Sequence, residues 1–250
     1  MKRFYFLTLA TCLYGLCAPA YAKDLAKNLE VDLELVLAVD ISYSVDEDEA
    51  RKQRDGYVAA LQSKEVVDAI RSGPHGRIAV IYVEWADSAM QRIVAPWTII
   101  ASKADANAFA KQVHDAPFVQ GHYTAIGSMV ERAMVLFDIN HADGLRQVID
   151  ISGDGPQNQG TSLETARQRA AERDIVINGL PIISETQDPW RPRVKVKIDN
   201  YYRNQVIAGP GAFVIPARDF DDFKKAVLRK MILEIADNTP HSAIGNGMRP

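Results

Sequence analysis

Short apolar runs alternate with amphipathic stretches along most of the chain. The runs have the length and β-branched content of strands buried on both faces, and the stretches between them repeat apolar residues at helical spacing. This alternation predicts a three-layer α/β fold, in which helices cover both faces of a doubly wound, mostly parallel sheet. The predicted strands are residues 33–41, 77–85, 91–100, 146–151, 175–183 and 212–216, and the predicted helices are residues 45–71, 103–115, 124–137, 161–174 and 220–236.

One connection departs from the parallel pattern. Only residues 86–90 separate the strands predicted at 77–85 and 91–100. Such a link suits a hairpin, whereas a parallel pair needs a longer crossover. Pro96 also fits an edge, because proline donates no hydrogen bond to a neighbouring strand. The sequence therefore predicts one antiparallel strand at an edge of the sheet.

Two polar patterns predict how helices begin. Residues 161–164 (Thr-Ser-Leu-Glu) match a capping box with Thr161 at the N-cap. The acidic run at residues 46–49 lacks the glycine that a calcium-binding loop needs at its sixth position. We interpret this run as favourable negative charge in the first turn of a helix.

The two ends of the chain and one internal segment differ from the alternating pattern. Residues 1–22 have the basic start, apolar run and small-x-small ending of a signal peptide, whose removal leaves 228 residues. The globular domain is predicted at residues 31–236, and the polar residues 237–250 are predicted to be a flexible tail. Residues 184–211 form an insertion-like segment that is too long for an ordinary connection.

Composition and charge narrow the function classes. Without residues 1–22 the chain has 27 basic and 32 acidic residues, and no basic block. Nucleic acid is therefore not an expected partner. Both cysteines, Cys12 and Cys17, lie in the predicted signal peptide, which excludes disulfides and thiol chemistry from the mature protein. No later apolar run approaches the roughly 20 residues that span a bilayer. We expect a periplasmic or secreted protein without membrane insertion.

Oxygen-bearing side chains follow the ends of several predicted strands. Ligands of open parallel sheets bind at the carboxyl ends of the strands. Hydroxyl and carboxylate oxygens suit a hard divalent cation, Mg²⁺ first and Mn²⁺ or Ca²⁺ as alternatives. The candidate metal residues are Asp40, Ser42, Ser44, Thr124 and Asp154. Hydroxyl ligands add no negative charge, so an open position on the metal would attract a carboxylate from a protein partner.

The order and spacing of these residues resemble the metal-ion-dependent adhesion site of von Willebrand factor type A domains. The chain has Asp-x-Ser-x-Ser, then Thr124 in a Gly-x-x-Thr-x-x-Gly context, then Asp154 followed by glycine, about 80 and then 30 residues apart. The resemblance implies that the two serines and the threonine touch the metal, and that the aspartates act directly or through water. Gly153 departs from the pattern, since threonine commonly precedes the aspartate.

A narrower resemblance covers residues 31–236. The Ser-Gly-Asp-Gly loop, the Tyr-Tyr-Arg at residues 201–203 and the Gly-Pro-Gly-Ala-Phe at residues 209–213 are similar to an exported bacterial family of unknown function that is classed with these domains. Membership implies a binding module and names no ligand.

Several residues have a structural reading beside the functional one. Ser44 is also a plausible helix N-cap. Glu84 and Asp150 interrupt apolar strands. We interpret both as hydrogen-bonded structural acids, in preference to groups that tune the metal site from outside its ligand set. Trp190, Tyr201 and Tyr202 are candidate partner contacts, although packing of the insertion onto the domain is the safer interpretation.

These observations lead to three hypotheses for function. The first is not enzymatic and therefore assigns no catalytic residue. The leading one is an exported, divalent-cation-dependent protein-binding module that is not an enzyme. An alternative is a metal-dependent phosphoryl hydrolase with Asp40 as nucleophile. The sequence argues against it, because such enzymes usually have an acid two residues after the nucleophile and position 42 is Ser. The other alternative is an exported small-molecule receptor.

Overall fold

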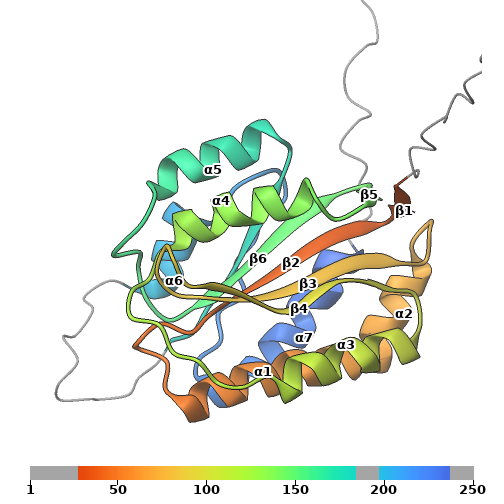
Figure 1. The fold of residues 1–250 in the computed structure, drawn as a ribbon, viewed down its shortest axis with the longest axis horizontal. Coiled ribbons are helices and arrows are strands. Elements are labelled where there is room, and N and C mark those ends of the chain that lie inside the picture. The colour runs from red at the N-terminus through yellow and green to blue at the C-terminus, as the bar shows by residue number, and fades with distance from the viewer. Residues whose placement is uncertain (1–27, 184–196, 237–250) are drawn as a thin grey trace, which may run out of the picture.

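A computed structural model describes residues 28–183 and 197–236 of the chain, and its centre is a five-stranded sheet (Figure 1). The strand order is β4-β3-β2-β6-β7, and β4 is the antiparallel member, paired with β3 at an edge. The α/β prediction and the antiparallel edge strand are thereby confirmed. The strands are β2 (Leu33–Asp40), β3 (Ile78–Trp85), β4 (Gln91–Ile100), β6 (Gln147–Gly153) and β7 (Val176–Pro181).

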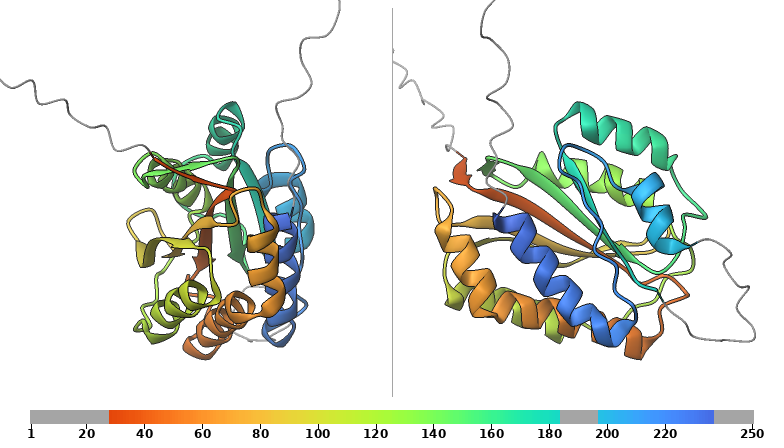
Figure 2. Two further views of the ribbon diagram at one scale, coloured as in Figure 1. Left: turned by 90° about the vertical axis from the view of Figure 1, so that its right-hand side faces the viewer. Right: turned by 180° about the vertical axis from the view of Figure 1, so that it is seen from behind.

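Helices cover both faces of this sheet and bury an apolar core on each (Figures 1 and 2). The first face carries α1 (Glu47–Gln62), α2 (Lys64–Ser72), α3 (Lys103–Asp115) and α7 (Phe220–Ala236). The second carries α4 (Ile126–Phe137), α5 (Leu163–Glu172), α6 (Ile198–Tyr201) and the π-helical turn η1 (Tyr202–Val206). Alternate residues of β2 and β6 enter the two cores, which explains their near-continuous apolar character.

The topology defines where a ligand is expected. From β2 the chain passes through α1 and α2 to β3 on one side, and it later returns to β6 on the other side of β2. The order of the parallel strands therefore reverses at β2, and the loops after β2 and β6 diverge at the same end of the sheet. Such a reversal point is the usual ligand position of open α/β sheets.

Two predicted helix boundaries are wrong. The predicted helix at residues 45–71 is divided at Ser63, whose backbone is extended and whose Oγ accepts from the Val66 backbone N–H at 3.1 Å, so that it caps α2. Helix α5 is capped by Ser162 and not by Thr161, because Ser162 Oγ accepts from the Thr165 backbone at 3.3 Å. The Thr161 backbone N–H instead donates to Ser128 Oγ at 3.0 Å, which holds Thr161 against α4.

The strand predicted at residues 212–216 is also wrong. Val214 makes only an isolated parallel bridge with Gly179, so this segment runs beside β7 without a continuous ladder. A small second sheet, which the sequence did not predict, pairs β1 (Leu29–Val31) with β5 (Ala142–Gly144). Residues 1–22 and 237–250, predicted as a signal peptide and a tail, lie outside the described residues.

Candidate metal centre

The first part of the candidate site lies where β2 ends. Asp40 is the last residue of β2, and its side chain is fully buried. Its Oδ1 accepts from the Ser42 backbone N–H at 2.7 Å, and its carbonyl oxygen accepts from Gln53 Nε2 at 3.2 Å. These contacts turn the chain sharply after the strand. They also hold both serines of the Asp-x-Ser-x-Ser motif at the carboxyl edge of the sheet.

The loop after β6 meets this turn. Ser44 Oγ donates to Asp154 Oδ1 at 2.5 Å, across 110 residues of sequence. Ser42 Oγ and Ser44 Oγ lie 3.0 Å apart. Four of the five predicted metal residues are therefore in one connected cluster at the point where the strand order reverses.

Thr124 reaches the same end of the sheet from the loop before α4. Its backbone N–H donates to Asn158 Oδ1 at 2.9 Å, and its carbonyl oxygen accepts from the Asn158 backbone at 2.9 Å. A Cβ atom placed on Gly155 would lie 4.0 Å from Thr124 Oγ1. Thr124 thus faces the loop that carries Asp154, as its place in the motif requires.

Hydrogen bonds from α1 and from the turn after β2 hold the loop that carries Thr124. Arg54 of α1 donates to the carbonyl oxygens of Ala116 and Pro117 at 2.5 and 3.0 Å, and the Gly121 backbone donates to the Ile41 carbonyl at 2.9 Å. Arg54 is itself buried beside Glu84 of β3, at 2.6 Å. The loop is therefore fixed to the body of the domain by buried polar contacts.

The electrostatics of the cluster favour a bound cation. Burial, and then the negative charge of Asp154, raise the pKa of Asp40 to about 8. Asp40 Oδ2 is buried and has no hydrogen-bond partner among the described residues. An orphaned, buried carboxylate oxygen is costly unless positive charge compensates it. These residues therefore fit a divalent cation.

The composition of the cluster restricts the kind of metal. The part of the chain that the structure describes has no group of three or more His, Cys, Asp or Glu side chains able to hold a metal ion. Any ion here would depend on a mixture of carboxylate and hydroxyl oxygens, which suits a hard cation better than a zinc-type nitrogen or sulfur site.

The candidate partner residues of the insertion differ in position. Trp190 lies outside the described residues. Tyr201 is half-buried, and its hydroxyl accepts from the Gln157 backbone N–H at 3.1 Å. Tyr202 is fully buried in the core beneath α4 and α5. The interpretation of Tyr202 as a partner contact is therefore wrong, because its side chain does not reach the surface.

Exposed aromatic side chains that the sequence analysis did not select lie next to the motif residues. Tyr43 and Tyr123 have relative exposures of 67% and 54%. Tyr43 also stacks on His122, with ring centroids 6.5 Å apart and ring planes inclined by 19°. Their positions, between the two serines and directly before Thr124, were the available signal, since residues that alternate with inward-facing ligands point outward.

Glu84 and Asp150 are structural acids in this arrangement. Glu84 pairs with Arg54 and with Arg92, the latter at 2.5 Å. Asp150 pairs with Lys230 at 2.6 Å, and both side chains are fully buried between β6 and α7. The structural interpretation thus accounts for both residues. The sequence analysis missed Lys230 because it lies in an otherwise ordinary amphipathic helix.

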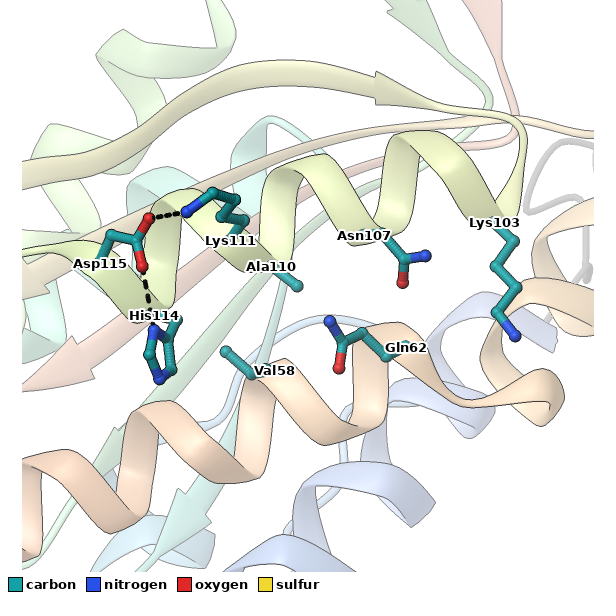
Figure 3. Close-up of a pocket in the computed structure, with 8 residues that line it drawn as sticks. All are labelled: Val58, Gln62, Lys103, Asn107, Ala110, Lys111, His114 and Asp115. Carbon is teal, nitrogen blue, oxygen red and sulfur yellow. Dashed lines mark hydrogen bonds and ion pairs between the residues drawn. The ribbon is translucent and has the colours of Figure 1, made fainter.

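A groove between α1 and α3 lies apart from this cluster (Figure 3). Val58 and Gln62 line it from α1, and Lys111, His114 and Asp115 are among its residues from α3. Lys111 and His114 both pair with Asp115 at the surface. The groove contains none of the five predicted metal residues.

The fold and this arrangement of strand-end loops define the class of protein. The chain has the fold of a von Willebrand factor type A domain. It belongs to a family described as protein of unknown function (DUF1194), whose model matches residues 30–239.

Solved structures show the same fold at low sequence identity. Proximal thread matrix protein 1 from the mussel byssus, with a zinc-occupied MIDAS motif, is 14% identical with a TM-score of 0.58, covering 84% of this chain and 50% of that one. The pilus adhesin SpaC from Lactobacillus rhamnosus GG, in an open conformation, is 14% identical with a TM-score of 0.60, covering 84% and 31%. A von Willebrand factor type A protein from Catenulispora acidiphila is 16% identical with a TM-score of 0.52, covering 84% and 43%.

The chain thus spans half or less of the length of these three structures. No curated protein sequence matches it. Among the described residues, no helix combines the length and the apolar character needed to cross a membrane.

Proposed function

We propose that the chain is an exported module that binds a protein partner through a divalent cation held by Asp40, Ser42, Ser44, Thr124 and Asp154. The observation that carries the proposal is the orphaned Oδ2 oxygen of Asp40, buried beside a second carboxylate and within a cluster of hydroxyls. Mg²⁺ is the first candidate, and Mn²⁺ or Ca²⁺ would meet the same oxygen ligands.

The ligand set explains why such an ion would serve adhesion. The hydroxyl groups bind without neutralising the ion, and an aspartate that acts through water leaves further positive charge available. A carboxylate of a partner protein is the group that this charge attracts most strongly. The printed descriptions of two similar structures, a pilus adhesin and a byssus matrix protein with a zinc-occupied MIDAS motif, agree with this role.

The exposed aromatic residues beside the site suit the rim of a protein interface. Tyr43, His122 and Tyr123 flank the cluster from two different loops, and aromatic residues are enriched where proteins meet. A partner that offers a carboxylate to the cation would cover these rings as it binds. Predicted export to the periplasm or beyond agrees with an adhesive role.

The hydrolase alternative is the weaker one. A nucleophilic Asp40 must be reached by the phosphorus atom of a substrate, yet its side chain is fully buried and one of its oxygens already accepts the Ser42 backbone N–H. Phosphatase turnover that is lost on Asp40→Asn would reverse this ranking.

The test is a calorimetric titration of the purified, EDTA-stripped protein with Mg²⁺ and with Mn²⁺. Saturable binding is expected in the wild type and in Asp48→Ala, which removes an exposed carboxylate one turn beyond the cluster. Asp40→Ala is expected to abolish the binding and to remain folded by circular dichroism, because it removes a buried oxygen that has no partner among the described residues. Equal metal affinity in Asp40→Ala and the wild type would refute the proposal.

A second experiment addresses the partner. Proteins captured from a periplasmic fraction in Mg²⁺ are compared with those captured in EDTA and by Asp40→Ala. A partner retained only by the metal-loaded wild type supports the adhesion role. Loss of its binding after its Asp and Glu residues are individually replaced would identify the carboxylate that contacts the ion.

A further inference from the structure

The side chain of Tyr202 is fully buried and lies close to glycines of two strands, β6 and β7. A Cβ atom placed on Gly179 of β7 would lie 2.7 Å from Tyr202 Cδ1. One placed on Gly153, at the end of β6, would lie 2.8 Å from the Tyr202 hydroxyl oxygen. Contacts this short exclude side chains at both positions. The two glycines thus leave the space that the Tyr202 side chain occupies, and its hydroxyl lies at the end of β6.

The hydroxyl of Tyr202 and the orphaned oxygen of Asp40 face the same small space. The Cβ position of Gly153 that lies 2.8 Å from the hydroxyl oxygen also lies 2.7 Å from Asp40 Oδ2. Both oxygens are buried, and neither has a hydrogen-bond partner in the described part of the chain. Two adjacent buried groups, one donor and one acceptor, are each costly alone and complementary together.

The hydroxyl is suited to donate. A phenol has an ordinary pKa of about 10 and therefore carries its proton at neutral pH. A phenol at this position therefore offers an O–H group near Asp40 Oδ2, an acceptor without a hydrogen-bond partner among the described residues.

We propose that Tyr202 is a positioning residue of the cation site, whose hydroxyl orients the Asp40 carboxylate directly or through one water. This inference rests on the proposed function, and it adds a residue from outside the five-residue motif. Gly153 makes the arrangement possible, because the space that a side chain would occupy there is taken by the phenol. The departure from threonine at this position is thereby explained.

A second contact from the same turn supports this role. Tyr201, the preceding residue, accepts from the backbone of Gln157 at 3.1 Å, and Gln157 Oε1 in turn accepts from the Gly127 backbone at 2.7 Å. The described part of the insertion-like segment therefore also holds the loop after Asp154, through Tyr201 and Gln157. The segment acts on the site from within the domain.

The test compares Tyr202→Phe with the wild type in the same Mg²⁺ titration, with thermal melting of the metal-free proteins as a second readout. Removing a group that orients a metal ligand typically weakens metal affinity 10–100-fold. We expect a loss of about tenfold for Tyr202→Phe, with a cooperative melting transition retained, because the ring still fills its place in the core.

Tyr82→Phe is the matched control. Tyr82 is also fully buried and its hydroxyl also has no partner among the described residues, but its side chain lies in the core on the opposite face of the sheet. Its replacement should leave the Mg²⁺ affinity unchanged.

The outcomes separate this inference from the proposed function. Absence of metal binding by the wild type would overturn both. Metal binding by the wild type with equal affinity in Tyr202→Phe would overturn the role of Tyr202 alone. Two further results would also overturn it, namely an equal loss of affinity in Tyr82→Phe, or a Tyr202→Phe protein that no longer folds, since either would assign the hydroxyl to the core in general.

Discussion

One lysine shares a buried site with two carboxyl groups, and this imbalance predicts an unusual dependence of stability on pH. Lys230 Nζ lies 2.6 Å from Asp150 Oδ1 and also contacts Glu234, to which Asn178 Nδ2 donates at 3.0 Å. The ionisable side chains are at most 1% exposed. Burial raises the pKa of Asp150 from 3.8 to about 7 against the attraction of Lys230, and the charge of Glu234 raises it further.

The direction of the effect follows from linkage. A carboxyl group whose pKa is raised by folding contributes stability that is fully present below its unfolded pKa and is lost as the pH rises through the folded pKa. For Asp150 the loss extends from about pH 4 to about pH 7, and the difference in pKa corresponds to about 4 kcal/mol. Asp150→Asn keeps the shape of the side chain and removes this loss.

Urea unfolding in EDTA at a series of pH values tests the reasoning. The free energy of unfolding of Asp150→Asn, relative to the wild type, should rise by up to about 4 kcal/mol between pH 4 and pH 8. Lys230→Met should have the opposite effect at pH 8, a loss of about 3–5 kcal/mol, because it leaves two buried carboxylates without a cation. If Asp150→Asn instead lost stability relative to the wild type as the pH rose, Lys230 would dominate the site and the reasoning would be refuted.

Two further predictions concern the scaffold of the site. Arg54→Met should lower the free energy of unfolding by about 3 kcal/mol, because it removes one cation from the buried Glu84 carboxylate. The exposed Arg51→Met should have no measurable effect in the same urea assay. Similar losses in both variants would contradict this prediction. Gly153→Ala should lower the free energy of unfolding by about 1–3 kcal/mol, because its Cβ would overlap buried oxygens. Gly155→Ala should be tolerated, because the nearest atom to its Cβ would be Thr124 Oγ1 at 4.0 Å. Equal melting temperatures of the two alanine variants would be inconsistent with that geometry.

The general architecture could be predicted from the sequence because it follows from local periodicity. Apolar runs buried on both faces become parallel strands, and the short link at residues 86–90 permits only a hairpin, so the fold class and the antiparallel edge strand did not depend on distant contacts. The acidic run at residues 46–49 likewise begins α1, with Asp46 at the N-cap and Glu49 completing a capping box.

Two of the errors occurred where a long-range contact decided between similar local choices. Thr161 and Ser162 are both good N-caps, and the bond from the Thr161 backbone to Ser128 of α4 leaves the cap to Ser162. Residues 212–216 have the composition of a strand, yet they make only isolated bridges beside β7. Local propensity does not contain the information that settles such cases.

By itself, the sequence determined the fold class, and its motif spacing supplied the prediction of five oxygen-bearing metal residues, because periodicity and spacing are properties of the chain. Only the tertiary structure decided which groups surround them. In the folded chain, Ser44 donates to Asp154, which is 110 residues away in sequence, and the buried Lys230 pairs with Asp150. Tyr202, which the sequence analysis treated as a candidate partner contact, is buried near Asp40. The reason is physical, since burial and partnership depend on residues far apart in sequence, whereas periodicity and spacing do not.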